Sequence, residues 1–391
     1  MRTIGAYLCI LLFLFGAFTA QSLSAQGVLS PQPVDAEPKD SISLGLIPVV
    51  TYTSELGLIM GAIGTRYHLS DDVKPYRSQL LLNMVGSTGG YFAGDIIYDQ
   101  VKAFDTDLRL TFELSFYQLF EDYYFGRGND LKFDEDRWDN EHYYFKSFGN
   151  EFTIKGRYPH QAYENGAYSD WIFETGYSYM NPKTLGDTTQ LAIDRPRGVP
   201  SAFNGQLGLG WVYENRDDEI NPTEGNYLWM LATAAPNFVG DFGYLKTWLE
   251  ARQYFSFDAG LTWTTAFRFN WKHSFGDEPF WALPEAGEGG SLRGYPFRRF
   301  IDNGAITMNA ELRTWFINFE SVKIKLGGVV FTDAGRVFRN LDDYKYAYSD
   351  LHITSGFGGV VSLFNPNFIL RMDLGFSAEG YLFYSGIGYL F

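Results

Sequence analysis

Strict alternation of apolar and polar side chains is the feature that most limits how this chain can fold. Residues 107–116 read DLRLTFELSF, in which every second residue is leucine or phenylalanine and the residues between them are polar. Successive side chains of a β-strand point to opposite faces of a sheet, whereas a helical face repeats every 3.6 residues. The same alternation returns in residues 244–257 and 322–333. The sequence therefore predicts an all-β fold.

The length and spacing of these segments favour a membrane barrel over a soluble β-sandwich. Segments of about ten residues suffice to cross a bilayer at a tilt. Short turns at 105–107, 258–260 and 365–367 alternate with long polar connections at 121–141, 181–201, 275–303 and 336–352. Outer-membrane barrels place short turns on one rim and long loops on the other. We predict a transmembrane antiparallel β-barrel of the outer-membrane type over residues 42–391.

The strand count follows from the same alternation. Candidate strands begin near residues 42, 56, 78, 91, 107, 142, 168, 203, 226, 244, 260, 304, 322, 353, 368 and 381. These make about sixteen strands, an even number of the kind that single-chain bacterial barrels use. The segments near 91 and 142 show the weakest pattern, so fourteen and eighteen strands stay open as alternatives.

The first 25 residues have the layout of a secretory signal peptide. A basic start precedes an apolar run over residues 4–18, and a small polar stretch follows. We place cleavage after Ala25, with Ala20 as the alternative; a membrane anchor is the competing interpretation, but the run is shorter than a span requires. Residues 26–41 are predicted to be a short periplasmic lead-in. Export implies the outer membrane of a Gram-negative bacterium.

Composition narrows the possible chemistry. The only cysteine, Cys9, lies in the predicted signal peptide, which leaves the exported chain without thiol or disulfide chemistry. A formal net charge of −15 without a basic block argues against nucleic-acid binding. The histidines show no metal-binding spacing and no G-x-S-x-G elbow is present, so we expect no enzyme activity, no metal and no cofactor. Residues 130–141 are acidic enough for a calcium site, but without EF-hand spacing we expect a solvated loop.

The C-terminal residues 384–391 read YSGIGYLF. A terminal phenylalanine with an aromatic residue two positions earlier resembles the C-terminal recognition signal of outer-membrane barrels, and its members are Tyr384, Gly386, Tyr389 and Phe391. We expect a last strand that ends at Phe391, with Ile387, Tyr389 and Phe391 on one face. An ordinary edge strand is the alternative, but such an apolar edge would favour aggregation in a soluble protein.

Three further motifs carry a family resemblance. Residues 289–295 read GGSLRGY within a long connection and are followed by RF at 299–300; NAELR at 309–313 and FTDAG at 331–335 lie on the next two predicted strands. This set resembles the BamA/TamA-type outer-membrane assembly superfamily, also called the bacterial surface antigen family. Weaker matches at 48–57, 124–129 and 214–225 extend the resemblance over residues 42–391. The resemblance implies a loop tip that folds back into the barrel, formed by Leu292, Arg293, Gly294 and Tyr295.

The resemblance also implies that Arg293 meets two acidic residues in the lumen, Glu311 and Asp333. Strand parity agrees, because Glu311 shares a face with Asn309 and Arg313, while Asp333 shares one with the polar residues 323 and 325. A guanidinium between two carboxylates forms strong bidentate hydrogen bonds, and Gly294 permits a tight turn. The alternative is that Arg293 contacts only water in a surface loop.

For function, the resemblance implies help with the insertion or translocation of proteins, or of lipid-linked material, through a seam between the first and last strands. Gly386 and Gly388 would weaken packing near that seam. Family members usually carry periplasmic POTRA domains, and the short lead-in here resembles a barrel-only branch. The expected partners are outer-membrane lipids and lipopolysaccharide, and outer-membrane protein clients or accessory subunits.

Two other functions stay open at this stage. A pore or transport barrel would use a polar lumen lined by Lys246, Glu250, Arg252, Lys323 and Lys325. A structural barrel that binds a partner without activity of its own would show the same strand pattern.

Overall fold

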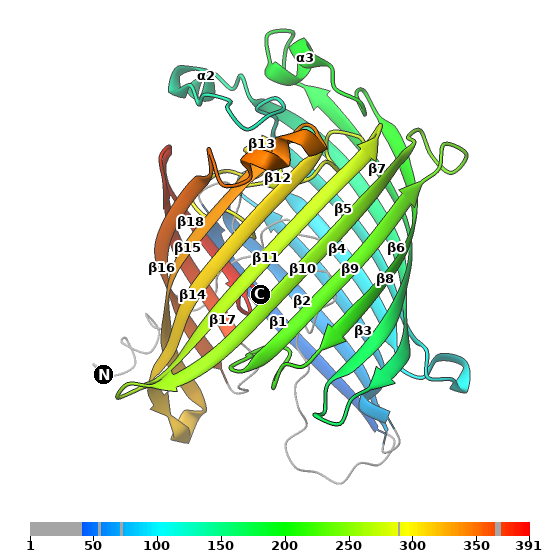
Figure 1. Cartoon of the computed structure of the whole chain (residues 1–391), viewed down its shortest axis with the longest axis vertical. Helices are drawn as coiled ribbons and strands as arrows, with labels where there is room; N and C mark the ends of the chain where they lie inside the picture. The colour runs from blue at the N-terminus through cyan, green and yellow to red at the C-terminus, as the bar shows by residue number, and fades with distance from the viewer. Residues whose placement is uncertain (1–40, 54–55, 71–72, 288–289, 364–368) are drawn as a thin grey trace.

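The barrel architecture is confirmed by a computed structural model, which describes residues 41–53, 56–70, 73–287, 290–363 and 369–391. Sixteen strands form one antiparallel sheet in which each strand pairs with its neighbours along the chain, and the sheet curls into a barrel (Figure 1). The predicted signal peptide, nearly all of the predicted lead-in and the predicted turn at 365–367 lie outside the described residues.

The strands follow the predicted segments closely. The third strand is the largest shift: it begins at Val73 rather than near residue 78, because residues 73–77 extend its ladder at the turn end. The strands of the sheet are β1 (Ser41–Thr53), β2 (Gly57–Ser70), β3 (Val73–Ser87), β4 (Phe92–Gln100), β5 (Arg109–Tyr123), β6 (Tyr144–Ala162), β7 (Tyr168–Thr184), β8 (Ala202–Glu214), β9 (Gly225–Ala235), β10 (Tyr244–Asp258), β11 (Thr262–Gly276), β14 (Gly304–Phe319), β15 (Ile324–Phe338), β16 (His352–Leu363), β17 (Ile369–Ser377) and β18 (Gly380–Ile387).

The two rims of the barrel differ as predicted (Figure 1). One rim carries the long connections, in which short elements form: α2 (Glu135–Asp139), α3 (Gln190–Asp194), η3 (Leu341–Tyr346) and a two-stranded sheet of β12 (Glu285–Ala286) and β13 (Phe300–Ile301). The other rim carries shorter turns, two of which contain η1 (Ala103–Asp105) and η2 (Glu320–Val322). In the described part of the chain, no helix has the length and apolar character needed to span a membrane.

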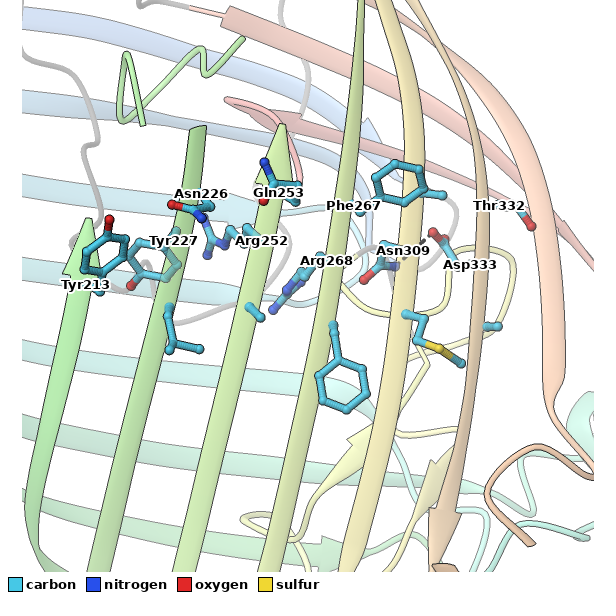
Figure 2. Close-up of a pocket in the computed structure, with 16 residues that line it drawn as sticks. Tyr213, Asn226, Tyr227, Arg252, Gln253, Phe267, Arg268, Asn309, Thr332 and Asp333 are labelled. Atoms are coloured by element: carbon cyan, nitrogen blue, oxygen red, sulfur yellow. Dashed lines mark hydrogen bonds between the residues drawn. The ribbon is translucent and has the colours of Figure 1, made fainter. Parts of the chain in front are cut away.

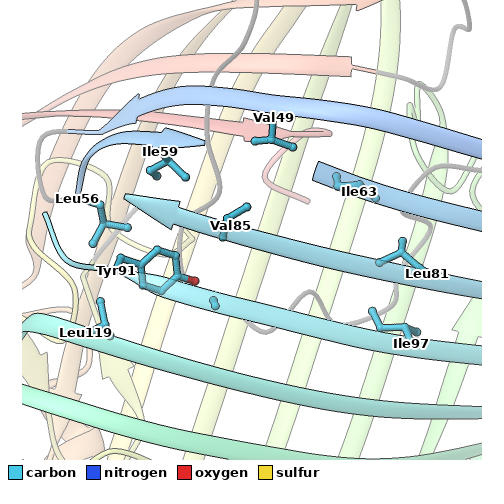
Figure 3. Packing of buried hydrophobic residues seen from close by; sticks show 10 residues of the cluster. Val49, Leu56, Ile59, Ile63, Leu81, Val85, Tyr91, Ile97 and Leu119 are labelled. Atoms are coloured by element: carbon cyan, nitrogen blue, oxygen red, sulfur yellow. The ribbon is translucent and has the colours of Figure 1, made fainter. Parts of the chain in front are cut away.

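The inner face of the barrel is not polar all round. On β1–β5 the inward side chains form an apolar cluster (Figure 3) that includes Val49, Ile59, Ile63, Leu81, Val85, Ala93 and Ile97. The outward neighbours of these residues are apolar as well and are exposed, for example Met60 and Met84. Charged inward residues occur on β4–β7, as in the pairs Arg109–Asp99 and Arg157–Asp170, and again on β10–β17. Lys323, predicted to face the lumen from a strand, lies in the turn before β15 with a φ of 52°.

The prediction that the last strand ends at Phe391 is wrong. β18 ends at Ile387, and Gly388 turns the chain with a φ of +80° while its amide donates to the carbonyl of Ile369 at 2.7 Å. Phe391 is buried against Tyr254 and Ala266, whose side chains point into the lumen. The last four residues therefore enter the barrel instead of extending its wall.

This inward turn leaves a weak seam between the first and last strands. No ladder joins β1 to β18 among the described residues. The hydroxyl of Ser385 donates to the carbonyl of Tyr52 at 3.4 Å, near the loop end of β1. Because β18 runs antiparallel to β1 and stops two residues after Ser385, the rest of the β1 edge toward Ser41 has β2 as its one paired neighbour among the described strands.

Candidate functional site: the loop tip inside the barrel

The connection between β11 and β14 folds into the lumen and presents a tip at residues 292–295. Its base is the β12–β13 ladder. Leu292 and Tyr295 are buried beside Phe300 from the same connection and beside Ala305 and Val337 from the barrel wall. This apolar contact positions the tip before any charge is considered, and it explains why a leucine and a tyrosine flank the Arg-Gly pair.

Arg293 lies at the centre of the site and is fully buried. Its Nε donates to Oδ2 of Asp333 and one terminal nitrogen donates to Oδ1 of the same carboxylate, both at 2.8 Å. The other terminal nitrogen donates to Oε1 of Glu311 at 2.6 Å. The structure thus brings together the three residues of the predicted pairing, with the bidentate geometry that only an arginine provides.

Two partners of Arg293 were missed by the sequence reasoning. Asp373 on β17 accepts from the guanidinium at 3.1 Å, and the ring of Phe331 lies 3.4 Å from the guanidinium carbon. Both side chains face inward, Phe331 two residues before Asp333 on β15. Strand parity places Asp373 on the inner face too, but no motif linked β17 to the tip.

The charges of the site cancel. Glu311 also pairs with Arg313 at 2.8 Å, and Asp373 pairs with Arg371 at 3.2 Å. Three arginines therefore face the three carboxylates of Glu311, Asp333 and Asp373. Buried charges need this matching, because the cost of removing them from water is recovered only through good pairing. Each carboxylate is held by a guanidinium, so the arrangement suits the fixing of a loop rather than proton transfer.

The backbone of the tip lies directly on β17. A Cβ at Gly294, where φ is +105°, would stand 2.9 Å from the carbonyl carbon of Phe376, and a Cβ at Gly375 would stand 2.7 Å from the amide of Gly294. The Ser377 hydroxyl donates to the carbonyl of Gly294 at 2.7 Å. Two glycines facing each other permit this approach, which larger residues would block.

Tyr384 contacts the tip directly. Its hydroxyl accepts the amide of Gly294 and donates to the carbonyl of Tyr295, both at 2.9 Å. The sequence pattern groups Tyr384 with the C-terminal residues Gly386, Tyr389 and Phe391. In that group, the ring of Tyr389 stacks under Arg313 at 4.0 Å, and Arg313 donates to the carbonyl oxygen of Phe391 at 2.9 Å. The C-terminal residues and the tip thus share one connected network.

A second set of arginines ties the same connection to other loops. Arg298 pairs with Asp122 at 3.2 Å, and Arg299 pairs with Glu379 at 2.7 Å. Arg127 reaches Asp302 from the loop after β5 at 2.9 Å. These pairs brace the loop rim around the tip. The sequence motif includes Arg299 but gives no signal for its partner, because Glu379 lies in a two-residue hairpin that belongs to no motif.

Together the fold and the site define a class: a transmembrane β-barrel of the outer-membrane type whose longest inward loop carries an Arg-Gly tip bound to the inner wall. The profile of the Omp85 superfamily domain matches residues 88–391. The chain therefore belongs to the Omp85 superfamily, which confirms the family resemblance seen in the sequence.

Solved structures support the same fold. BamA from Haemophilus ducreyi lacking POTRA domains 1–3 superposes with a TM-score of 0.58 at 16% identity, over 90% of this chain and 70% of that one. CdiB from Escherichia coli gives a TM-score of 0.58 at 12% identity, over 90% of this chain and 64% of that one. CdiB from Acinetobacter baumannii gives 0.54 at 9% identity, over 89% and 65%. A comparison with curated protein sequences finds no match.

Proposed function

We propose that this barrel assists the insertion or translocation of proteins, or of lipid-linked material, at the outer membrane of a Gram-negative bacterium. The seam between β1 and β18 would be the working surface. Family membership supports the general role, and the structural similarity to BamA and CdiB supports the barrel type. Under this proposal the partners are outer-membrane lipids, lipopolysaccharide and outer-membrane protein clients, and the chain is not an enzyme.

One observation carries the proposal: among the described residues, the edge of β1 has no partner strand over most of its length. An unpaired strand edge presents free amides and carbonyls to which another strand can add. In a membrane such an edge is costly unless something pairs with it, because lipid offers no hydrogen bonds. A client strand that adds to β1 would therefore gain hydrogen bonds that β18 does not supply.

The contacts of the loop tip also support this proposal. Arg293 and its carboxylates join β14, β15 and β17 through one loop, so those strands are held together from inside. No comparable ion-pair cluster appears on the inward side of β1–β3 among the described residues. Opening at the seam can then occur by movement of β1 while β14, β15 and β17 stay joined to the tip.

A cysteine crosslink tests the seam. We would place cysteines at Tyr52 and Ser385, whose backbone and side chain already meet, in a chain whose one natural cysteine lies in the predicted signal peptide. A matched control pair at Leu245 and Phe275 spans the paired strands β10 and β11. Inserted client is measured by protease protection in proteoliposomes. The oxidised Tyr52–Ser385 variant should lose activity and regain it on reduction, while the control keeps it; equal activity of both oxidised variants would refute the seam.

Conductance separates this proposal from a pore. The tip and its connection fill the loop side of the lumen, so planar bilayers should show only small currents. A large steady current from the unmodified barrel would favour a transport pore instead. A structural barrel would be favoured by two results together: a deletion strain that keeps all its outer-membrane proteins, and a partner that co-purifies after gentle extraction.

A further inference from the structure

A groove crosses the outer wall of the barrel, on the face away from the lumen. It encloses about 830 Å³, and Figure 2 shows its labelled residues following one another across the strands. Ladder pairing puts part of its lining in one row of outward side chains that crosses six strands, namely Tyr213, Leu228, Ala251, Phe269, Met308 and Ala334. The inward residues that alternate with this row are the charged residues of the lumen, such as Arg252 and Asp333.

Small side chains create the hollow. A second row, two residues away, pairs Gln253 with Phe267, Phe267 with Ala310 and Ala310 with Thr332. Alanines at 251, 310 and 334 form the floor, while the exposed rings of Phe267 and Phe269 rise beside them. Large side chains such as Met230, Phe255 and Val330 are exposed on the same strands, so this floor is a local depression of apolar character.

The groove has a direction. Tyr213 lies one residue before β8 ends at the turn rim, whereas Ala334 lies four residues before β15 ends at the loop rim. The polar members Tyr213, Asn226 and Gln253 gather at the turn end, where the amide of Gln253 donates to the carbonyl of Gly225 at 3.0 Å. Five interstrand steps of about 4.8 Å give the groove a length of about 24 Å. It therefore climbs obliquely from a polar end at the membrane interface to an apolar end in the membrane interior.

We propose that this groove binds one phospholipid of the periplasmic leaflet, with an acyl chain along Phe269 and Met308 and the headgroup beside Tyr213 and Gln253. The proposal rests on the outer-membrane location given above. Amide and phenol groups, without an outward charge in the lining, suit a zwitterionic headgroup. The inward arginines of these strands are unavailable, because Arg252 and Arg268 both pair with Glu250.

The bound lipid would stabilise β14 and β15, the strands that hold Arg293, from outside the barrel. Met308 and Ala310 alternate on β14 with Asn309 and Glu311, and Thr332 and Ala334 flank Asp333 on β15. A ligand that fills the depression covers the backs of the strands that hold Arg293. Lipid occupancy should therefore raise the resistance of the barrel to unfolding.

Groove-filling variants test the proposal. The probe is zwitterionic phospholipid in mixed detergent micelles, and the readout is the number of phospholipids retained per folded protein after washing, measured by mass spectrometry. Ala251→Leu and Ala310→Leu place a larger side chain on the groove floor. Ala232→Leu makes the same change at an exposed outward position of β9 outside the groove. We expect about one retained phospholipid for the natural sequence and for Ala232→Leu, and about tenfold weaker retention for both groove variants, equivalent to about 1.4 kcal/mol.

Equal retention by the groove variants, no retention by the natural sequence, or displacement of the phospholipid by lipopolysaccharide would each overturn the inference. Migration of unheated, folded barrel on gels reports insertion separately. A barrel that inserts but retains no phospholipid refutes the groove alone, whereas a chain that never inserts into outer-membrane lipid refutes the proposed location. Two groove variants are used so that one misfolded variant leaves the other to decide.

Discussion

The wall formed by β14–β18 and the wall formed by β1–β4 are built from the same alternating strands but behave as opposites. The first presents arginines and carboxylates to the lumen, and they hold the tip at Arg293. The second presents mostly aliphatic residues to both faces, with Asp95 and Asp99 of β4 as inward charges, and it ends in an edge that meets β18 near Tyr52. The contrast shows that a barrel can fix one part of its circumference and leave another free without changing the strand pattern.

Loss of Arg293 should produce the largest effect on the stability of the wall formed by β14–β18. Arg293→Ala leaves the buried carboxylate of Asp333 without a guanidinium partner, and breaking a buried ion pair costs about 3–5 kcal/mol. The free energy of unfolding, measured by denaturant titration of the folded barrel in detergent, should fall by that amount. Arg137→Ala, which removes an exposed ion pair on α2, should change it by less than about 1 kcal/mol. Similar losses of unfolding free energy in the two variants would contradict the claim that Arg293 stabilises this wall.

Steric contact between the tip and β17 gives the next effect. Gly375→Ala places a Cβ 2.7 Å from the backbone of the tip, whereas Gly359→Ala on β16 meets open space. Overpacking costs about 1–3 kcal/mol, so the first variant should lower the unfolding free energy by that amount and the second should leave it nearly unchanged. Protease cleavage within the β11–β14 connection would report release of the tip. A tip equally protected in both variants would disprove the close approach.

A single hydroxyl should give a smaller change. Tyr384→Phe removes the group that accepts from Gly294 and donates to Tyr295. Buried groups left without partners cost about 1–3 kcal/mol, and the site should lose an amount at the lower end of that range. Tyr381→Phe, at an exposed position of the same strand, is the matched control in the same denaturant titration. Indistinguishable unfolding midpoints for the two variants would show that the Tyr384 hydroxyl does not stabilise the tip.

The smallest expected effect lies on neither wall, in the turn between β8 and β9. Burial raises the pKa of Asp217, but hydrogen bonds from the Thr223 hydroxyl and from the amides of Glu224 and Thr223 lower it more, so the pKa lies below its usual value. A lowered pKa in the folded state contributes stability above the unfolded value of about 3.9, and that stability is lost as the pH falls further. The natural sequence should therefore lose slightly more stability than Asp217→Asn between pH 5 and pH 3. Parallel pH profiles would show that this carboxylate does not stabilise the turn.

Much of the fold could be predicted because alternation in a barrel wall is enforced on both faces. Outward side chains must suit lipid and inward ones must suit the lumen, so the alternation in a segment such as residues 107–116 predicts a strand. The pairing of Arg293 with Glu311 and Asp333 could be predicted for the same reason. The family motif indicates the two acids, and strand parity places both of them on the inner face.

What escaped prediction depends on packing between distant strands. Asp373 satisfies the same parity rule as Asp333, but only the three-dimensional closure of the wall brings β17 beneath the tip. The inward turn of residues 388–391 depends on Gly388 and on Arg313, whose guanidinium carbon lies 4.0 Å from the ring centre of Tyr389 and 5.1 Å from that of Phe391. The apolar inner face of β1–β4 is visible in residues such as Ile59 and Ile63, but these strands carry apolar residues on both faces, so alternation alone does not show which face is inward.

Hydrogen exchange compares the two walls most directly. Amides of β1 and β15 would be followed by mass spectrometry in the natural barrel reconstituted in lipid vesicles. The unpaired edge predicts that β1 amides that do not donate to β2 exchange at least about tenfold faster than those of β15, which has paired strands on both sides. Equal protection of the two strands would show that β1 is paired in the membrane, and that the barrel has no free edge.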